Sequence, residues 1–178
     1  MLKSSRLTFR ALKPTDINST YLGWLNDPYV NRCLETRHCP QSLESLNSYW
    51  QAHRDDPSSP WFAICLAADG RHIGNIKLGP INWIHRRADL SLFIGERNCW
   101  GKGYASEAIA TVRDWAFCEL DLQKLNAGIY FGNIASRRAF EKCGFELEGT
   151  MRQEVVSGGE RIDTWRLGLP RALAKTNI

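Results

Sequence analysis

The sequence lacks the features that would place it outside the ordinary globular proteins. No run of 18 apolar residues occurs in its 178 residues, so neither a membrane-spanning helix nor a membrane partner is predicted. The opening segment, MLKSSRLTFRALKPTD, has no apolar stretch like that of a signal peptide, and a cytoplasmic location is expected. The six cysteines include no CxxC pair and the four histidines no HExxH motif. A metal site is therefore not expected.

A strong net charge is also lacking. The formal charge is +4 at pH 7 and the sequence pI is about 8.8, which is too little to predict a nucleic-acid partner but favours a phosphate-bearing small molecule somewhat. The composition is 43% hydrophobic and 24% charged, with no internal repeat and no long linker. These values predict one globular domain over residues 1–178.

The order of the predicted elements indicates a mixed α/β fold. Helices are expected from Thr15, as the capping residue, to residues 26–28, and from Ser42 to about residue 53. The clearest helix spans 105–116, where apolar residues recur with the period of a helix packed on a sheet. A short helix follows over 136–143. Strands are expected over 7–12, 61–67, 72–78, 88–94 and 125–131, and a hairpin over 145–156 and 161–167. Strand, helix and strand in this order predict a parallel crossover in the second half.

A loop with two glycines joins the strand at 88–94 to the long helix. Its sequence is NCWGKGYASEA, from Asn98 to Ala108. Gly101 and Gly103 let the backbone approach a ligand closely, and the unpaired amides at the helix start favour an anion such as pyrophosphate. A tight strand-to-helix turn would also need glycine. The loop is neither a Walker loop, because GxxxxGK[ST] is absent, nor a dinucleotide fingerprint, because the third glycine is missing.

The two segments WGKGYASEA and NIASRRAFEKCGF, each placed after a predicted strand, resemble the acetyl-CoA site of the GNAT superfamily. The resemblance is greatest over about residues 88–149, and within the superfamily it points to the branch of ribosomal-protein N-terminal acetyltransferases. It implies a twisted mixed sheet of about seven strands, flanked by about four helices and splayed at the acetyl-CoA site. It also implies an acetyl-CoA-dependent N-acetyltransferase in which the acceptor amine attacks the thioester directly.

The resemblance further implies the residues that bind the acetyl donor. The amides between Trp100 and Ala105 are expected to bind the pyrophosphate. The strand end at Leu92, Phe93 and Ile94 is expected to pair with the pantetheine arm and hold the thioester carbonyl. Asn133 is expected to contact the pantetheine amides. Arg138 and Lys142 are expected to reach phosphates or the adenosine. The full set for the donor is Leu92, Phe93, Ile94, Trp100, Gly101, Lys102, Gly103, Tyr104, Ala105, Asn133, Ser136, Arg138 and Lys142.

The expected catalytic residues are Ser136 and Asp89. Many members of the superfamily carry a tyrosine, seven residues after the asparagine, that protonates the departing thiolate, and here that position is Phe140. Ser136 is the hydroxyl expected to donate to the CoA sulfur instead, although a serine there could simply cap a helix. Asp89 is the first candidate for the general base because it lies on the strand leading to the thioester, and Glu35 and His85 follow.

The acceptor amine is left open by the sequence. A protein N-terminus follows from the branch resemblance. An amino sugar on a nucleotide carrier would suit the basic residues Arg32, Arg37, Arg86 and Arg87. A polyamine or aminoglycoside ranks third, because a cationic acceptor calls for an acidic cleft and this chain is basic. A CoA-binding domain without catalysis is the alternative class, motivated by Phe140. Dimers are common in the superfamily, and a homodimer is left open.

Overall fold

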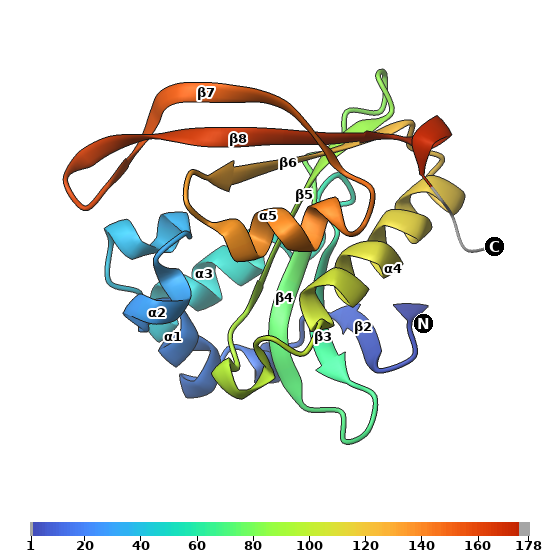
Figure 1. Ribbon diagram of the computed structural model, residues 1–178. Coiled ribbons are helices and arrows are strands. Elements are labelled where there is room, and N and C mark those ends of the chain that lie inside the picture. Colours follow the sequence, from blue (N-terminus) through green and yellow to red (C-terminus); the bar gives the residue numbers. More distant parts are fainter. Residues whose placement is uncertain (1, 175–178) are drawn as a thin grey trace.

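The computed structural model describes residues 2–174, whose strands form one eight-stranded sheet in the order β1-β2-β3-β4-β5-β6-β8-β7 (Figure 1). The strands are β1 (Leu2–Lys3), β2 (Leu7–Ala11), β3 (Trp61–Leu66), β4 (His72–Leu78), β5 (Arg87–Ile94), β6 (Lys124–Tyr130), β7 (Glu146–Ser157) and β8 (Glu160–Pro170). The α-helices are α1 (Ser19–Asn26), α2 (Pro28–Asn31), α3 (Leu43–His53), α4 (Tyr104–Cys118) and α5 (Ile134–Glu141).

Among the described strands, only β5 and β6 pair in parallel, and all other neighbours are antiparallel. The parallel pair is the place where the chain crosses over through α4, as the order of predicted elements indicated. The mixed α/β class is therefore confirmed, with eight strands and five α-helices instead of about seven and four. The additional elements, β1 with two residues and α2 with four, are too short to produce a periodic sequence pattern.

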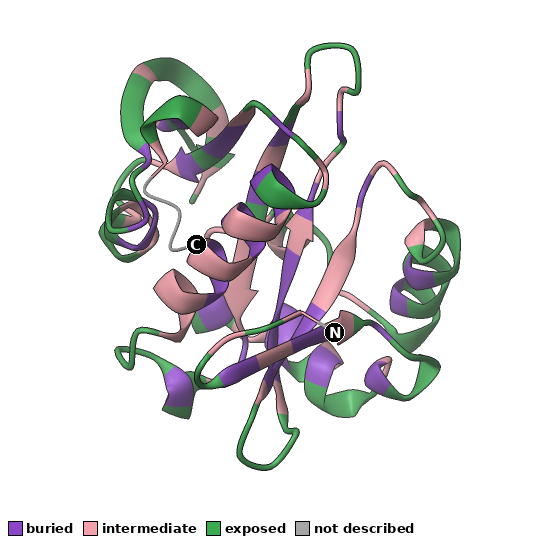
Figure 2. Cartoon of the chain, turned by 90° about the vertical axis from the view of Figure 1, so that its right-hand side faces the viewer, coloured by how far each residue is buried: buried purple, intermediate pink, exposed green. Residues whose placement is uncertain are grey.

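The sheet separates two apolar clusters because alternate residues of each strand point to opposite faces. In β3, Ile64 lies in one cluster while Ala63 and Cys65 lie in the other. The first cluster includes the inner faces of α4 and α5, and the second includes those of α1 and α3. Figure 2 shows the buried central strands between the helical layers. The sheet is therefore covered on both faces, and its splayed strands can be held rigidly.

The start of α1 corrects one expectation. Thr15 was expected to cap a helix, but residues 14–16 form a single 3-10 turn and Asn18 caps α1 by accepting hydrogen bonds from the amides of Thr20 and Tyr21. The physical reason is Asp16. Its carboxylate accepts from the Lys13 amide at 2.7 Å, so the turn over residues 14–16 closes on itself before α1 begins. Helix α5 likewise begins at Ile134, two residues before the predicted start, with Asn133 as its cap.

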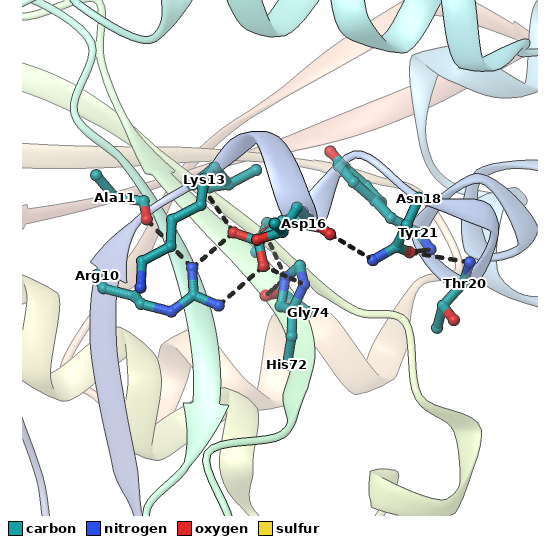
Figure 3. A network of polar contacts seen from close by, with 12 residues as sticks. Arg10, Ala11, Lys13, Asp16, Asn18, Thr20, Tyr21, His72 and Gly74 are labelled. Atoms are coloured by element: carbon teal, nitrogen blue, oxygen red, sulfur yellow. Dashed lines mark hydrogen bonds and ion pairs between the residues drawn. The ribbon is translucent and has the colours of Figure 1, made fainter.

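A buried polar network, drawn in Figure 3, anchors this turn to the sheet. Asp16 is 5% exposed and accepts two hydrogen bonds from the Arg10 guanidinium, at 2.6 and 2.8 Å. His72 lies 3.8 Å from Asp16 through Nδ1 and contacts the Asn75 side-chain oxygen at 2.9 Å through Nε2. Burial lowers the pKa of His72, outweighing the contacts with Asn75 and Asp16 that raise it. His72 is therefore held neutral in the fold.

This burial predicts a loss of stability in mild acid. The pKa of His72 is lower in the folded chain than in the unfolded chain, so the unfolded state binds more protons once the pH falls below the ordinary histidine pKa of about 6.5. The melting temperature is expected to fall between pH 7 and pH 5, and His72→Gln should flatten this dependence. His85→Gln, at an exposed histidine, should keep the wild-type slope. Equal slopes in all three proteins would contradict the assignment.

Candidate functional site

Strands β5 and β6 diverge after their first three pairs, which are Arg87 with Lys124, Ala88 with Leu125, and Asp89 with Asn126. From Leu90 onward β5 keeps its pairing with β4 as far as Ile94, and β6 keeps its pairing with β8 as far as Tyr130. The two strands therefore open a gap in the middle of the sheet, each supported on its outer side. This is the splay that the resemblance implied.

Alternation decides which backbone groups of β5 face the gap. Gly79 donates to the carbonyl of Asp89 at 2.8 Å, and Gly95 donates to the carbonyl of Ile73 at 2.9 Å. In an antiparallel pair the hydrogen-bonded positions alternate, so Asp89, Ser91 and Phe93 direct their backbone groups to β4. The groups of the even-numbered residues Leu90, Leu92 and Ile94 point to the gap.

Two expectations about the pantetheine contacts are corrected by this geometry. The backbone of Phe93 faces β4, and its ring stacks on Tyr21 with centroids 6.1 Å apart, so Phe93 supports the strand from behind. The carbonyl of Ile94 accepts the indole N–H of Trp100 at 2.7 Å. Both backbone groups of Leu92 and the Ile94 amide remain directed into the gap, where they can pair with an extended ligand.

The loop between β5 and α4 has the conformation that its glycines predict. Gly101 and Gly103 have φ values of +73° and +81°, and a Cβ at Gly101 would meet no atom within 4 Å. The space outside the loop is therefore open. The first amides of α4 point into it, since the first bond within the helix runs from the Glu107 amide to the Gly103 carbonyl. This cradle of amides can bind an anion such as a phosphate group.

One amide must be removed from the expected set. The Trp100 N–H donates to the Arg97 carbonyl at 3.0 Å inside a 3-10 turn, η3 (Arg97–Cys99). It therefore cannot also bind a phosphate. The amides of residues 101–105 remain in place, and the exposed Lys102 side chain lies beside them with no ion-pair partner in residues 2–174.

A brace from the N-terminal segment holds this loop, and sequence analysis missed it. Arg6 donates to the Lys102 carbonyl at 3.0 Å and to Glu107 at 2.7 Å, and its guanidinium stacks on the Tyr104 ring at 4.6 Å. Glu107 also accepts from Ser4. Partial burial acts to raise the pKa of Glu107, but these donors outweigh it and lower the pKa. Glu107 therefore fixes Arg6 against the start of α4.

Helix α5 begins at the end of β6, next to the gap. Asn133 accepts from the Ser136 amide at 3.3 Å and is the cap of α5. Helix capping, the alternative role for Ser136, is therefore performed by Asn133. The Ser136 hydroxyl makes no hydrogen bond within the described residues. Phe140 is 2% exposed and packs edge-on against Phe145, so this position belongs to the core. Arg138 and Lys142 are exposed one turn apart on α5.

The face of the sheet opposite α4 carries the candidate general base. Asp89 is paired with Asn126 in the closed part of the β5–β6 ladder, and its Oδ2 accepts from Arg166 at 3.1 Å. Its Oδ1 is buried and has no hydrogen-bond partner among residues 2–174. His85 precedes β5, at the end of the strand away from the gap, and is exposed.

A pocket of about 300 Å³ lies where β6 ends. It is lined by Arg32 and Cys33 after α2, by residues 130–133, and by Ser157 and Ile162 of the β7–β8 hairpin. Figure 1 shows that hairpin extending over α1 and α2. The Tyr130 hydroxyl contacts the carboxylate of Glu35, and burial together with that carboxylate raises the pKa of Tyr130 to about 12. The contact joins two segments that lie far apart in the sequence.

The described part of the chain, residues 2–174, contains neither a candidate metal site nor a candidate membrane-spanning helix. No group of three or more His, Cys, Asp or Glu side chains in residues 2–174 is arranged to hold a metal ion. No helix within the same residues is both long enough and apolar enough to cross a membrane.

Comparison with known proteins adds to this geometry. A family model described as an acetyltransferase (GNAT) domain matches residues 6–146. An N-acetyltransferase of Bacillus licheniformis is 28% identical over 177 residues, 94% of each chain. The spermidine N(1)-acetyltransferase of Vibrio cholerae is 28% identical over 173 residues, 92% of each chain. A crystal structure of the Vibrio cholerae spermidine N-acetyltransferase with CoA and spermine has a TM-score of 0.85 at 27% identity, covering 96% of this chain and 98% of that one. These matches do not single out the ribosomal-protein branch that the sequence pointed to.

Proposed function

The chain belongs to the GNAT acetyltransferase family and is an acetyl-CoA-dependent N-acetyltransferase, and from this premise we propose that it acetylates a primary amine that attacks the thioester directly. The observation that carries the proposal is the gap between β5 and β6, which exposes the backbone of Leu92 beside the glycine loop. The donor enters through the gap. The acceptor approaches from the face that carries Asp89 and the pocket at Tyr130.

In this reaction the protein chiefly positions the donor and the amine and stabilises the charge that develops on the thioester oxygen. Amides of the loop at Gly101 and Gly103 bind the donor phosphates, while Leu92 pairs with the pantetheine arm in the manner of a strand. This fixes the thioester carbonyl at the mouth of the gap, where an amine can attack its carbon. Backbone N–H groups directed into the gap stabilise the oxygen as it gains negative charge.

Ser136 is proposed to hydrogen-bond the CoA sulfur as the thiolate departs. Its hydroxyl lies in the first turn of α5 without a competing partner in the described residues, and Phe140 has no proton to give. Ser136→Ala is expected to lower kcat well beyond tenfold, with little change in the Kd of acetyl-CoA. Thiol release and calorimetric titration of acetyl-CoA measure the two quantities. The matched control is Ala135→Ser on the same helix turn. Unchanged turnover in Ser136→Ala would contradict the role.

Asp89 is proposed as the general base, acting directly or through one water. Its Oδ1 is free to accept a proton, while Arg166 holds Oδ2. Asp89→Asn is expected to remove the acid limb of the kcat/KM profile against pH, because the group that must be deprotonated is lost. The fold should persist, since Arg166 is partly exposed and can be solvated. An Asp89→Asn variant that retains the wild-type acid limb would contradict this role, and Glu35 would be the next candidate.

Three acceptor classes are supported by different observations. A polyamine is the first to test, because the matching enzymes of Vibrio cholerae and Escherichia coli are named spermidine N(1)-acetyltransferases and one was crystallised with spermine. An amine on a phosphorylated small molecule is favoured by Arg32, a cation in the pocket wall. A protein N-terminus rests on the sequence resemblance alone.

The test is a thiol-release assay with acetyl-CoA against spermidine, phosphorylated amino sugars and N-terminal peptides. Turnover with one class supports the proposal and identifies the acceptor chemistry. If no amine is acetylated while acetyl-CoA still raises the melting temperature, the proposed reaction is wrong for these amines. This result would favour the alternative function, a CoA-binding domain without catalysis.

A further inference from the structure

The pocket at the end of β6 contains one uncommitted charge, and that charge is positive. Arg32 lines the pocket and is exposed. Its guanidinium makes no hydrogen bond and no ion pair with any residue from 2 to 174. No carboxylate is among the described residues that line the pocket. A cationic acceptor such as a polyamine would therefore meet a like charge that no carboxylate of the pocket lining balances.

The charged neighbours of Arg32 are already engaged. Arg37 donates to the carbonyl of Arg32 at 2.8 Å and to that of Val156 at 2.5 Å, and it stacks on the Tyr130 ring at 4.5 Å. It ties the pocket wall to the β7–β8 hairpin and has a structural task. Glu35 accepts from the Tyr130 hydroxyl and lies 3.8 Å from His38. Arg32 thus stands out because its guanidinium has no hydrogen-bond or ion-pair partner among residues 2–174.

The rest of the pocket suits a hydroxylated ring of modest size. Ser157 contributes a hydroxyl, and Phe131 presents a ring that is 56% exposed. A volume of about 300 Å³ is at the lower end of the range for small-ligand sites. A sugar that carries a phosphate matches all three properties, since guanidinium recognises phosphate with two parallel hydrogen bonds.

From these observations we infer that the pocket binds an acceptor amine on a phosphorylated small molecule, with Arg32 binding the phosphate and setting the preference against polyamines. The inference rests on the proposed function and specifies its substrate class. The cations at the other end of β5 take no part in it, contrary to the expectation that they would join in binding a diphosphate. Arg86 is paired with Asp121, and Arg87 is at the strand end away from the gap.

The experiment compares acceptors that differ only in the phosphate. Glucosamine and glucosamine 1-phosphate present the same amine on the same ring, and spermidine is the cationic competitor. We expect kcat/KM for glucosamine 1-phosphate to exceed that for glucosamine and for spermidine at least tenfold. Arg32→Glu should remove this advantage through KM, and Arg32→Lys should retain part of it. Arg87→Glu, the same charge change at an exposed arginine outside the pocket, should behave like the wild type.

A binding measurement separates this inference from the proposed reaction. Glucosamine 1-phosphate is titrated calorimetrically into CoA-saturated wild-type protein and into the Arg32→Glu variant. Binding that depends on Arg32 without turnover would keep the phosphate site and overturn the proposed reaction for this amine. Turnover that favours spermidine, or that is indifferent to Arg32→Glu, would overturn the inference and leave the acetyltransferase proposal standing. The absence of both binding and turnover would also overturn the inference.

Discussion

Gly101→Asp is expected to raise the KM for acetyl-CoA about a hundredfold while the protein remains folded. Gly101 has a φ of +73° and a Cβ there would meet no atom within 4 Å. Aspartate is among the few residues with a side chain that visit this left-handed conformation. The substitution therefore places a carboxylate beside the amides proposed to bind the donor phosphates. At about 5 Å and an effective dielectric constant of about 20, two like charges repel by roughly 3 kcal/mol, which corresponds to about a hundredfold in affinity.

Gly101→Asn is the matched control for this prediction. Asparagine has the shape of aspartate and the same tolerance of positive φ, but it carries no charge. Any backbone strain is therefore common to both variants, and the difference between them isolates the electrostatic repulsion. The Kd of acetyl-CoA, measured by calorimetry with both proteins, should separate them by at least tenfold. Equal affinities would show that the loop does not approach the phosphates, and the donor site would have to be placed elsewhere.

The strand, loop and helix that form the candidate donor site could be predicted from the sequence because this information is local. A strand, a loop with Gly101 and Gly103 and an amphipathic helix occupy consecutive residues, and their spacing fixes the direction of the amides. Even for this segment, which backbone groups face the gap depended on how the strands pair. Whether Phe93 or Leu92 faces the gap follows from the register with β4, and the Trp100 amide was lost to a short turn. Neither fact can be read from a pattern of apolar residues.

The acceptor side could not be predicted because its contacts join distant segments. Glu35 meets Tyr130 across 95 positions and Asp89 meets Arg166 across 77. These pairs form only once β8 and the segment that follows α2 have been placed against the sheet. Net charge was also a poor guide. The chain is basic overall, yet the pocket wall holds a single cation without a partner among residues 2–174, Arg32.

The second large effect is expected at Gly95, where β5 ends and the donor loop begins. A Cβ added there would lie within the van der Waals radii of the Trp24 ring atoms Cγ, Cδ2 and Cε3. Trp24 is buried and is enclosed by His72 and Phe93, with ring centroids at 5.0 and 6.4 Å, so the indole cannot move aside. Gly95→Ala is expected to cost about 3 kcal/mol of folding free energy, at the upper end for overpacking. For a chain of this size that is roughly 6–12 °C in Tm.

Two controls make this steric explanation testable. Gly23 is an exposed glycine in α1 whose Cβ would meet nothing within 4 Å, so Gly23→Ala should stabilise the protein by roughly 0.5–1 kcal/mol through helix propensity alone. In a Trp24→Leu background the cost of Gly95→Ala should fall below about 1 kcal/mol, because the clash is removed and the two sites are coupled. Thermal and urea unfolding measure all four proteins of the cycle. An additive cycle would mean that Gly95 is required for its backbone and not for its contact with Trp24. A coupled cycle would identify Trp24 as the contact through which α1, on the acceptor side, fixes the end of the strand that positions the donor.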